Sequence, residues 1–183
     1  MSKIYNFDDS VIIGDRGEAD FLRNKTGWKK LPYNGKNSDA HYKDFIHTSG
    51  KTLEQKTENY TSTGTGNNYC EMFSDTNRSV IGGPFRAVIR STDYFMHYYI
   101  KDHVIFYYPT DKYVKRILEL YEAKTVYDIL EGFRKGKNYK YKLYNIHNRP
   151  EDGRPDYWTL GAPIKRYEFA DILIKQETWT DVI

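Results

Sequence analysis

The sequence predicts an α/β (α+β) domain in which a mixed central sheet is flanked by helices, with additions at the C-terminal end. Three observations predict this class. Residues 44–58 have the pattern of a β-hairpin, residues 103–108 form a continuous apolar run of strand length, and residues 111–123 place apolar side chains at helical spacing. For a chain of 183 residues one domain is the simplest organisation, with a core at about 15–123 and a C-terminal extension at about 124–183.

The composition is that of a soluble, folded protein. Charged residues make up 29% of the chain, the mean hydropathy is −0.80 and aromatic residues reach 16%. No segment approaches the roughly 20 apolar residues of a membrane span, and the first ten residues have no apolar signal core, so we expect a cytoplasmic protein. The lone Cys70 excludes a disulfide framework. The net charge of +3 permits a nucleic-acid partner without requiring one.

The first predicted element is a helix over residues 15–26. Asp15 is its candidate N-cap, and Glu18 follows at the capping-box spacing. Gly27 is well placed to end this helix. A short strand or turn is expected over residues 28–32.

The predicted hairpin consists of two runs, 44–48 and 51–58, joined by Ser49 and Gly50. Side chains alternate faces along a strand, which predicts one face with Glu54, Lys56 and Glu58 and the other with Leu53, Gln55 and Thr57.

The turn of this hairpin folds Asp44 back towards Glu54 and Lys56, so two carboxylates and a lysine are expected to converge. Carboxylates, waters and a substrate phosphate form the ligand set that Mg²⁺ prefers. A lysine beside the metal holds the attacking water and offsets charge on the phosphate. This pattern therefore predicts metal-assisted phosphodiester hydrolysis. Asp39 is an alternative aspartate, but it falls in a loop rich in Gly, Asn and Ser, and a metal ligand needs a rigid support.

Five further elements are expected after the hairpin. Residues 68–74 are predicted as a third strand and residues 91–99 as a helix that begins with a Ser-Thr cap. Residues 103–108 form a buried strand, and residues 111–123 and 125–133 form helices. Up to residue 108 the order is α-β-β-β-α-β. The remaining tail is expected to add a strand and a closing element.

Asp44, followed ten positions later by Glu54-Gln55-Lys56, resembles the D…(D/E)xK pattern of the PD-(D/E)XK nuclease superfamily. The resemblance implies the restriction-endonuclease-like fold, whose core order is also α-β-β-β-α-β. Two positions depart from the pattern. Lys43 stands where the family often has proline, and Gln55 is polar where an apolar residue is usual, so its buried amide needs hydrogen-bond partners.

Two more segments resemble this family, and the resemblance as a whole covers roughly residues 15–108. The sequence RGE at 16–18 looks like the step that precedes an active-site glutamate on the first helix. The sequence TGN at 65–67, followed by Glu71, resembles a pattern of phage-encoded members. Each has a simpler interpretation, since Glu18 is favourable in a helix's first turn and Glu71 suits the solvent face of a strand.

The resemblance implies a Mg²⁺-dependent deoxyribonuclease, with Mn²⁺ as a substitute, that leaves a 5′-phosphate and a 3′-hydroxyl. Asp44, Glu54 and the backbone carbonyl of Gln55 would hold the metal, with Glu71 as a further ligand or a supporting carboxylate. Lys56 would position the attacking water, and Glu18 would complete the acidic pocket. An endonuclease is expected, in the host cytoplasm if phage-encoded; exonuclease, junction resolvase and a preference for RNA remain open.

A basic segment over residues 134–142 is the candidate DNA contact, because basic groups bind phosphates and its two tyrosines can stack on bases. Its cations are Arg134, Lys135, Lys137, Lys140 and Lys142. The simpler interpretation is a solvated sheet edge protected by lysines. Cutting both strands in place would suggest a homodimer.

Two other functions are compatible with the sequence. The first is a catalytically inactive nuclease-fold protein that binds nucleic acid or acts as an inhibitor. The second is a small interaction protein with ordinary surface charges on its hairpin. Zinc and nucleotide hydrolysis are not expected, because the sequence has no HExxH motif and no P-loop. Cys70 is expected in the core.

Overall fold

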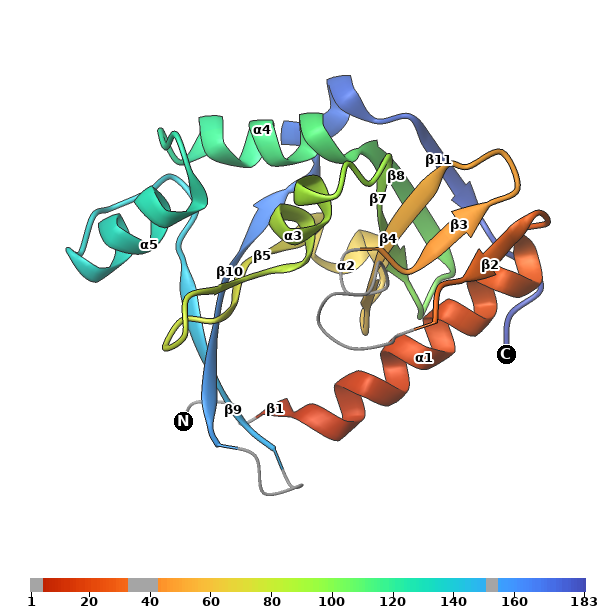
Figure 1. Ribbon diagram of the computed structural model, residues 1–183, viewed down its shortest axis with the longest axis horizontal. Helices are drawn as coiled ribbons and strands as arrows, with labels where there is room; N and C mark the ends of the chain where they lie inside the picture. The colour runs from red at the N-terminus through yellow and green to blue at the C-terminus, as the bar shows by residue number, and fades with distance from the viewer. Residues whose placement is uncertain (1–4, 33–42, 151–154) are drawn as a thin grey trace.

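The computed structural model describes residues 5–32, 43–150 and 155–183 (Figure 1). Its elements in chain order are β1 (Tyr5–Asn6), α1 (Phe7–Asn24), β2 (Trp28–Lys30), β3 (Phe45–His47), β4 (Thr52–Glu58), α2 (Ser62–Thr65), β5 (Asn67–Asp75), β6 (Val80–Ile81), α3 (Gly83–Ile89), β7 (Tyr94–Tyr99), β8 (Val104–Pro109), α4 (Thr110–Leu120), α5 (Val126–Arg134), β9 (Tyr144–Arg149), β10 (Tyr157–Lys165), the 3₁₀ helix η2 (Arg166–Ile172) and β11 (Lys175–Thr178). Over these ranges no helix is long and apolar enough to cross a membrane.

Within these residues the strands form two sheets. The larger sheet has six strands in the order β11-β8-β7-β4-β3-β2, and the smaller has five in the order β1-β9-β10-β5-β6. In the larger sheet β4 and β7 pair in parallel, whereas the neighbouring strands pair antiparallel. The expectation of a mixed α/β protein with a mixed central sheet flanked by helices is therefore confirmed.

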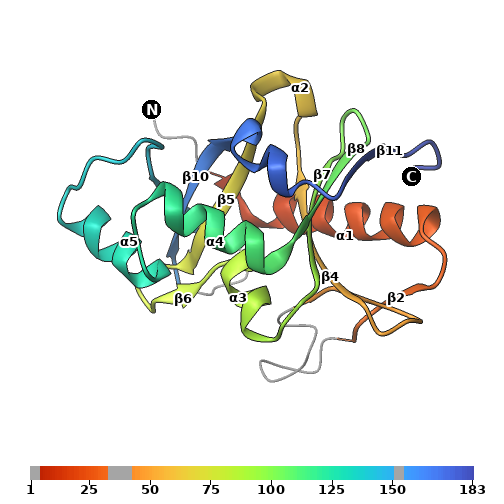
Figure 2. The ribbon, with the colours of Figure 1, turned by 90° about the horizontal axis from the view of Figure 1, so that it is seen from above.

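Helices cover both faces of the larger sheet (Figure 2). Helix α1 packs on the face that carries Leu53, where Phe21 and Phe45 form an apolar cluster with it. Helices α3 and α4 lie on the opposite face, and Phe95 and Tyr113 belong to the larger cluster on that side. The two faces of β4 are thus both buried, and they differ in chemistry, because only the face towards α3 carries charged side chains.

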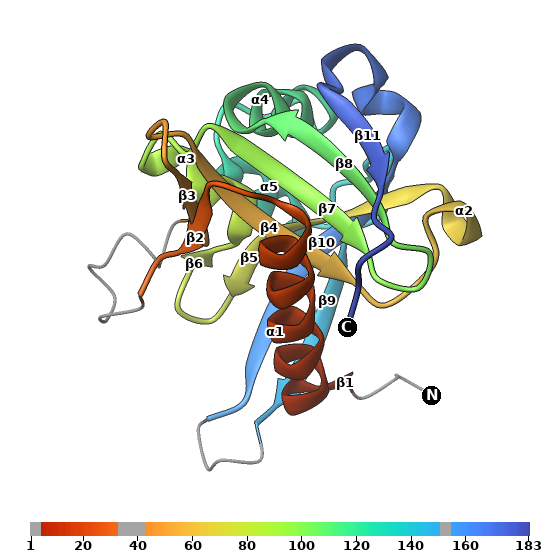
Figure 3. The ribbon, with the colours of Figure 1, turned by 90° about the vertical axis from the view of Figure 1, so that its right-hand side faces the viewer.

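The C-terminal third of the chain completes both sheets. Strand β10 pairs with β5, and β11 pairs with β8. Strands β9 and β10 form a long antiparallel pair that extends away from the rest of the molecule (Figure 3). The tail therefore contributes the expected added strand, β10, and η2 and β11 close the structure.

Several expected elements are confirmed. Strands β3 and β4 pair antiparallel around the turn at Ser49 and Gly50, and Gly50 has a φ of 84°, which glycine adopts without strain. The apolar run at 103–108 is the interior strand β8, and the two helices expected after it are α4 and α5. The segment at 28–32 contains the short strand β2.

Two expectations were wrong. Helix α1 begins at Phe7, so Asp15 lies inside it and is not its N-cap. The segment expected as a helix at 91–99 contains strand β7, whose residues are buried on both faces and therefore lack the alternation that distinguishes a strand. The segment at 68–74 is a strand, as expected, and it pairs with β10 and β6 in the smaller sheet.

Gly17 allows α1 to approach β4 closely. A Cβ atom at this position would lie 2.8 Å from Gln55 Nε2 and closer still to Thr57 Oγ1. We predict that Gly17→Ala lowers the free energy of unfolding by about 1–3 kcal/mol, the usual cost of overpacking. Gly14→Ala in the same helix is the matched control. A Cβ there meets nothing within 4 Å, so alanine should stabilise the helix by about 1 kcal/mol. Urea denaturation measures the free energy of unfolding of both variants. Equal changes in the two variants would contradict the close packing of Gly17 against β4.

Candidate active site

The β3–β4 hairpin brings Asp44 beside β4. Asp44 immediately precedes β3, and its backbone N–H donates to the carbonyl of Leu53 at 2.9 Å. Its side chain then crosses to the next strand, where Oδ2 accepts a hydrogen bond of 2.7 Å from the N–H of Gln55. This contact fixes the carboxylate next to Glu54, as the sequence predicted. Asp39, the alternative aspartate, lies outside the described residues.

Asp44 and Glu54 are held in an environment that disfavours their charges. Glu54 is 7% exposed and Asp44 is half-buried. Burial, followed by the charge of Glu18, raises the pKa of Asp44 to about 7. Burial and the charge of Asp44 likewise raise the pKa of Glu54 well above its ordinary value. Burial and mutual repulsion therefore favour the protonated forms of these two carboxyl groups.

Lys56 shares the face of β4 that carries Glu54. Its Nζ lies 3.9 Å from Oε2 of Glu71 on β5, and Ser74 donates a 2.9 Å hydrogen bond to the other oxygen of Glu71. Burial opposes the charge of Lys56, but the carboxylates of Glu71, Glu58 and Glu54 outweigh burial and raise its pKa. Lys56 is thus an ammonium ion at neutral pH, and Glu71 points towards the site rather than to open solvent.

Glu18 lies at the other side of the pair. The close approach at Gly17 holds this part of α1 against β4, and the charge of Glu18 reaches both Asp44 and Glu54. Glu18 also forms an ion pair with Lys30 of β2. Glu18, Asp44 and Glu71 thus all lie within electrostatic range of Glu54, and we call these four residues the carboxylate cluster.

Gln55 faces α1, on the opposite side of β4 from Glu54. Its Nε2 donates to Thr57 Oγ1 at 3.0 Å, and its Oε1 is buried with no hydrogen-bond partner among the described residues. Among the described residues, the side-chain amide of Gln55 therefore has a hydrogen-bond partner for its nitrogen and none for its oxygen. Its backbone, through the bond to Asp44, contributes directly to the site.

A hollow of about 190 Å³ opens beside the carboxylate cluster. A hollow of this size has room for several water molecules. Its lining comes from β4, β5, α3 and β7, namely Glu54, Gln55, Lys56, Tyr69, Glu71, Gly83, Pro84, Arg86 and Phe95. Arg86, whose Nη2 lies 3.8 Å from Glu54 Oε1, was not identified from the sequence.

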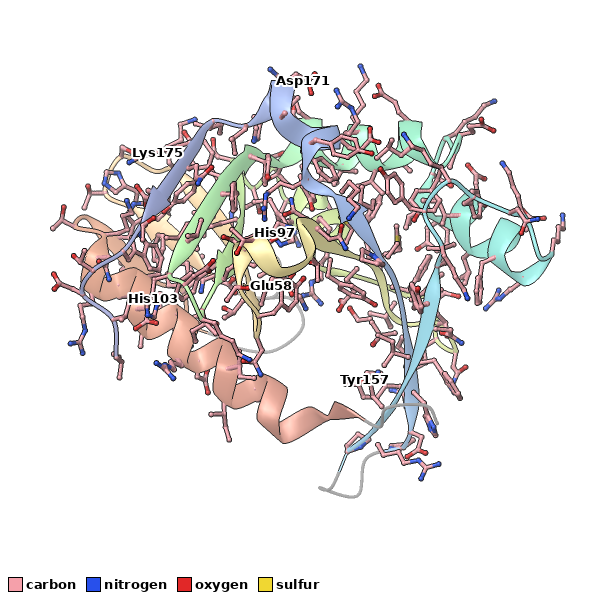
Figure 4. The ribbon with its side chains drawn as sticks, turned by 180° about the vertical axis from the view of Figure 1, so that it is seen from behind. Glu58, His97, His103, Tyr157, Asp171 and Lys175 are labelled. Atoms are coloured by element: carbon pink, nitrogen blue, oxygen red, sulfur yellow. The ribbon has the colours of Figure 1, made fainter. Side chains whose placement is uncertain are left out.

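A series of buried polar side chains, Glu58, His97 and Tyr113, was also not identified from the sequence. Nδ1 of His97 lies 3.2 Å from Oε1 of Glu58, and Nε2 of His97 lies 2.7 Å from the hydroxyl of Tyr113. Burial lowers the pKa of His97, although Glu58 opposes the shift. Figure 4 labels Glu58 and His97 on neighbouring strands in the middle of the molecule. Tyr113 in turn contacts the sulfur of Cys70, which is buried as expected.

The basic segment at 134–142 lies apart from the hollow, beside α5 at one end of the molecule (Figure 1). Its cations have protein partners. Arg134 donates to the carbonyl of Thr76, Lys135 and Lys137 pair with Glu131 and Glu122, Lys140 pairs with Glu168, and Lys142 lies over the ring of Tyr144. Lys135, Lys137 and Lys140 nevertheless keep about half or more of their side-chain surface exposed.

The donor set of the cluster consists of carboxylate oxygens, which suit Mg²⁺ or Mn²⁺ rather than soft metals. In the part of the chain that the structure describes, no three His, Cys, Asp or Glu side chains lie close enough together to form a finished metal-binding group. Lys30 forms an ion pair with Glu18, and Nη2 of Arg86 lies 3.8 Å from Oε1 of Glu54.

Comparisons with models of known protein families, with curated proteins and with solved structures found no significant match in any of the three.

Proposed function

We propose that this protein is a Mg²⁺-dependent nuclease of the PD-(D/E)XK type, most consistent with an endonuclease that hydrolyses phosphodiester bonds in DNA. The observation that carries the proposal is that Glu54 and Lys56 line one hollow while Asp44, bonded to the N–H of Gln55, lies beside Glu54 on the same hairpin. Two acids with raised pKa values beside a lysine in a recess are typical of a catalytic site.

The element order supports the proposal. Helix α1, strands β2, β3 and β4, helix α3 and strand β7 follow one another as α-β-β-β-α-β, with α2, β5 and β6 inserted before α3. This is the order that the resemblance to the superfamily implies, although the sequence predicted a different segment for each element after the first helix. In this arrangement β4, the strand of the ExK motif, pairs in parallel with the strand that follows the second helix.

In this proposal Asp44, Glu54 and the backbone carbonyl of Gln55 hold Mg²⁺, or Mn²⁺ in its place. The bound metal would supply positive charge to the substrate phosphate and acidify a water molecule. The raised pKa values of Asp44 and Glu54 fit this role, since a cation offsets both the desolvation that burial causes and the repulsion between the carboxylates. Glu71 and Glu18 complete the acidic pocket.

Lys56 acts on the attacking water and on the phosphate. It is cationic, it lines the hollow beside Glu54, and its ammonium group is held by Glu71 at 3.9 Å, a distance that leaves its hydrogen-bond donors available. Such a group orients a water lone pair and stabilises the charge that develops on the phosphate oxygens. The expected products are a 5′-phosphate and a 3′-hydroxyl.

The basic segment would extend the DNA contact beyond the site. Its exposed lysines offer charge to phosphates, and their present acidic partners are surface ion pairs, which contribute at most about 1 kcal/mol and are readily exchanged. Because the segment lies away from the hollow, it would add salt-dependent affinity rather than chemistry.

The test is a cleavage assay on supercoiled plasmid and on linear single- and double-stranded DNA, with Mg²⁺, Mn²⁺ or EDTA. We expect loss of supercoiling with either metal and none in EDTA. Cleavage of linear DNA from its ends, with the plasmid intact, would make the enzyme an exonuclease. Tight, metal-independent DNA binding without turnover would favour instead the inactive nuclease-fold alternative.

A further inference from the structure

Arg86 enters the hollow with much of its hydrogen-bonding capacity unused. Its Nε is buried and has no hydrogen-bond partner among the described residues. Its Nη2 lies 3.8 Å from Glu54 Oε1, beyond the usual ~3.2 Å limit of an N–H···O bond. A guanidinium group carries several N–H donors and no acceptor. The single ion pair with Glu54 therefore leaves a planar set of donors at the edge of the hollow.

The backbone that carries Arg86 is held in place by a close contact. A Cβ atom on Gly82 would lie 2.7 Å from the carbonyl oxygen of Glu71, so glycine is needed for α3 to start against β5. The N–H of Arg86 donates to the carbonyl of Gly82 at 2.9 Å, and Pro84 stiffens the same turn. The position of Arg86 relative to Glu71 and Lys56 is thus fixed by the fold rather than by the ion pair.

Arg86 and Lys56 flank the same hollow, and each is paired at long distance with one member of the carboxylate cluster. Arg86 faces Glu54, and Lys56 faces Glu71. If Glu54 is occupied by a metal, as in the proposed function, the arginine loses its only described acidic partner. An anion in the hollow would then meet two cations of different geometry, of which arginine is the one suited to bidentate contact with phosphate.

We infer that Arg86 is a substrate-contacting residue that binds a phosphate group of the nucleic acid inside the hollow, between α3 and β4. This inference rests on the proposed function for the identity of the substrate. The phosphate group itself is indicated by the unused guanidinium donors and the neighbouring Lys56. The arginine exchanges its contact with Glu54 for one with the phosphate.

The test uses thymidine 3′,5′-bisphosphate, which carries two phosphate groups and no internucleotide bond, added with Mg²⁺ to the ¹⁵N-labelled protein. The Nε–Hε NMR signal of Arg86 is assigned by its loss in Arg86→Lys. We expect this signal to shift and saturate as the nucleotide is added, and we expect Arg86→Gln to weaken binding by at least about tenfold, since a charge-assisted pair is lost. The signal of Arg116, which is paired with both oxygens of Asp171 outside the hollow, should not move.

Cleavage gives the second measurement. Arg86→Gln should lower kcat/KM by about 10²–10³-fold, and Arg86→Lys should recover part of the loss, whereas Arg116→Lys should cleave as the wild type does. An Arg86 signal that stays fixed, whether the bisphosphate binds elsewhere or not at all, overturns the inference. So does wild-type kcat/KM in Arg86→Gln, and the nuclease assignment then stands. A saturable shift of the Arg86 signal in a protein that cleaves no DNA supports the phosphate site and refutes the nuclease assignment.

Discussion

Lys56→Ala and Glu54→Ala are each expected to abolish metal-dependent DNA cleavage while the fold is retained. Lys56 lines the hollow as a cation, and in the proposed mechanism its loss removes the group that would orient the water and offset phosphate charge. Loss of Glu54 removes a proposed metal ligand. Each variant should lose about 10³-fold or more of the wild-type rate, because removal of a single electrostatic donor already costs about 10²–10³-fold.

The measurement is the initial rate of plasmid nicking in Mg²⁺ and in Mn²⁺, with circular dichroism and thermal melting to establish that each variant is folded. Lys51→Ala is the matched control for charge, because Lys51 lies on the same hairpin and pairs with Asp93 at 2.7 Å, outside the hollow. It should cleave at the wild-type rate. If Lys56→Ala and Glu54→Ala also cleave normally, the hairpin is not the catalytic site.

The part of this site that could be predicted from the sequence is the part that forms locally. Asp44, Glu54 and Lys56 lie on one hairpin, where the turn and the alternation of side chains determine which residues meet. Glu18 and Glu71 were predicted as site residues only through the resemblance to a family. No local sequence feature excludes the simpler interpretation of Glu18 as a first-turn acid or of Glu71 as a solvent-facing charge. Their position near the pair depends on glycines at 17 and 82, whose importance lies in contacts distant in the sequence.

Arg86 and His97 could not be found in the same way. Arg86 lies on the seven-residue helix α3, which is too short for a periodic pattern, and its neighbour Glu54 is more than 30 positions earlier in the chain. His97 lies on β7, a segment that the sequence predicts as a helix. A strand buried on both faces shows a continuous run of large residues, and a Ser-Thr-Asp sequence before it imitates a helix cap.

That Ser-Thr-Asp sequence has a different role in the structure. Asp93 accepts hydrogen bonds from the N–H and the hydroxyl of Thr52, at 2.9 and 3.0 Å, and so ties the start of β7 to the start of β4. A side chain that caps a strand pair has the same residue preferences as one that caps a helix. Distinguishing the two requires knowledge of which strands are neighbours, and the parallel pairing of β4 with β7 spans some 40 residues.

Asp44→Asn is expected to stabilise the metal-free protein at pH 8, although it should abolish metal binding. Burial and the charge of Glu18 raise the pKa of Asp44 from 3.8 to about 7 in the folded state. An acid with a raised pKa holds its proton more tightly when folded, so the wild type loses stability as the pH rises from about 4 through about 7. Asparagine keeps a carbonyl oxygen for the N–H of Gln55 and does not ionise.

The predicted gain is about 2–4 kcal/mol at pH 8, since one unit of pKa shift corresponds to ~1.4 kcal/mol and partial exposure of Asp44 reduces the effect. At pH 4 the two proteins should be nearly equal. Urea denaturation in EDTA at both pH values measures this difference, and repetition with Mg²⁺ should raise the stability of the wild type much more than that of the variant.

Asp93→Asn is the control, because its effect on the free energy of unfolding at pH 8 should have the opposite sign. Burial alone would raise the pKa of Asp93, but hydrogen bonds from Lys51 and Thr52 outweigh it and lower the pKa. The carboxylate of Asp93 therefore stabilises the fold at neutral pH, and the variant should be less stable than the wild type at pH 8. If Asp44→Asn is also destabilising at pH 8, the carboxylate of Asp44 is favourably held without a metal. The two aspartates would then both stabilise the fold through their carboxylates. In that case Asp44 would not lower the stability of the metal-free protein, and this support for a bound cation would be lost.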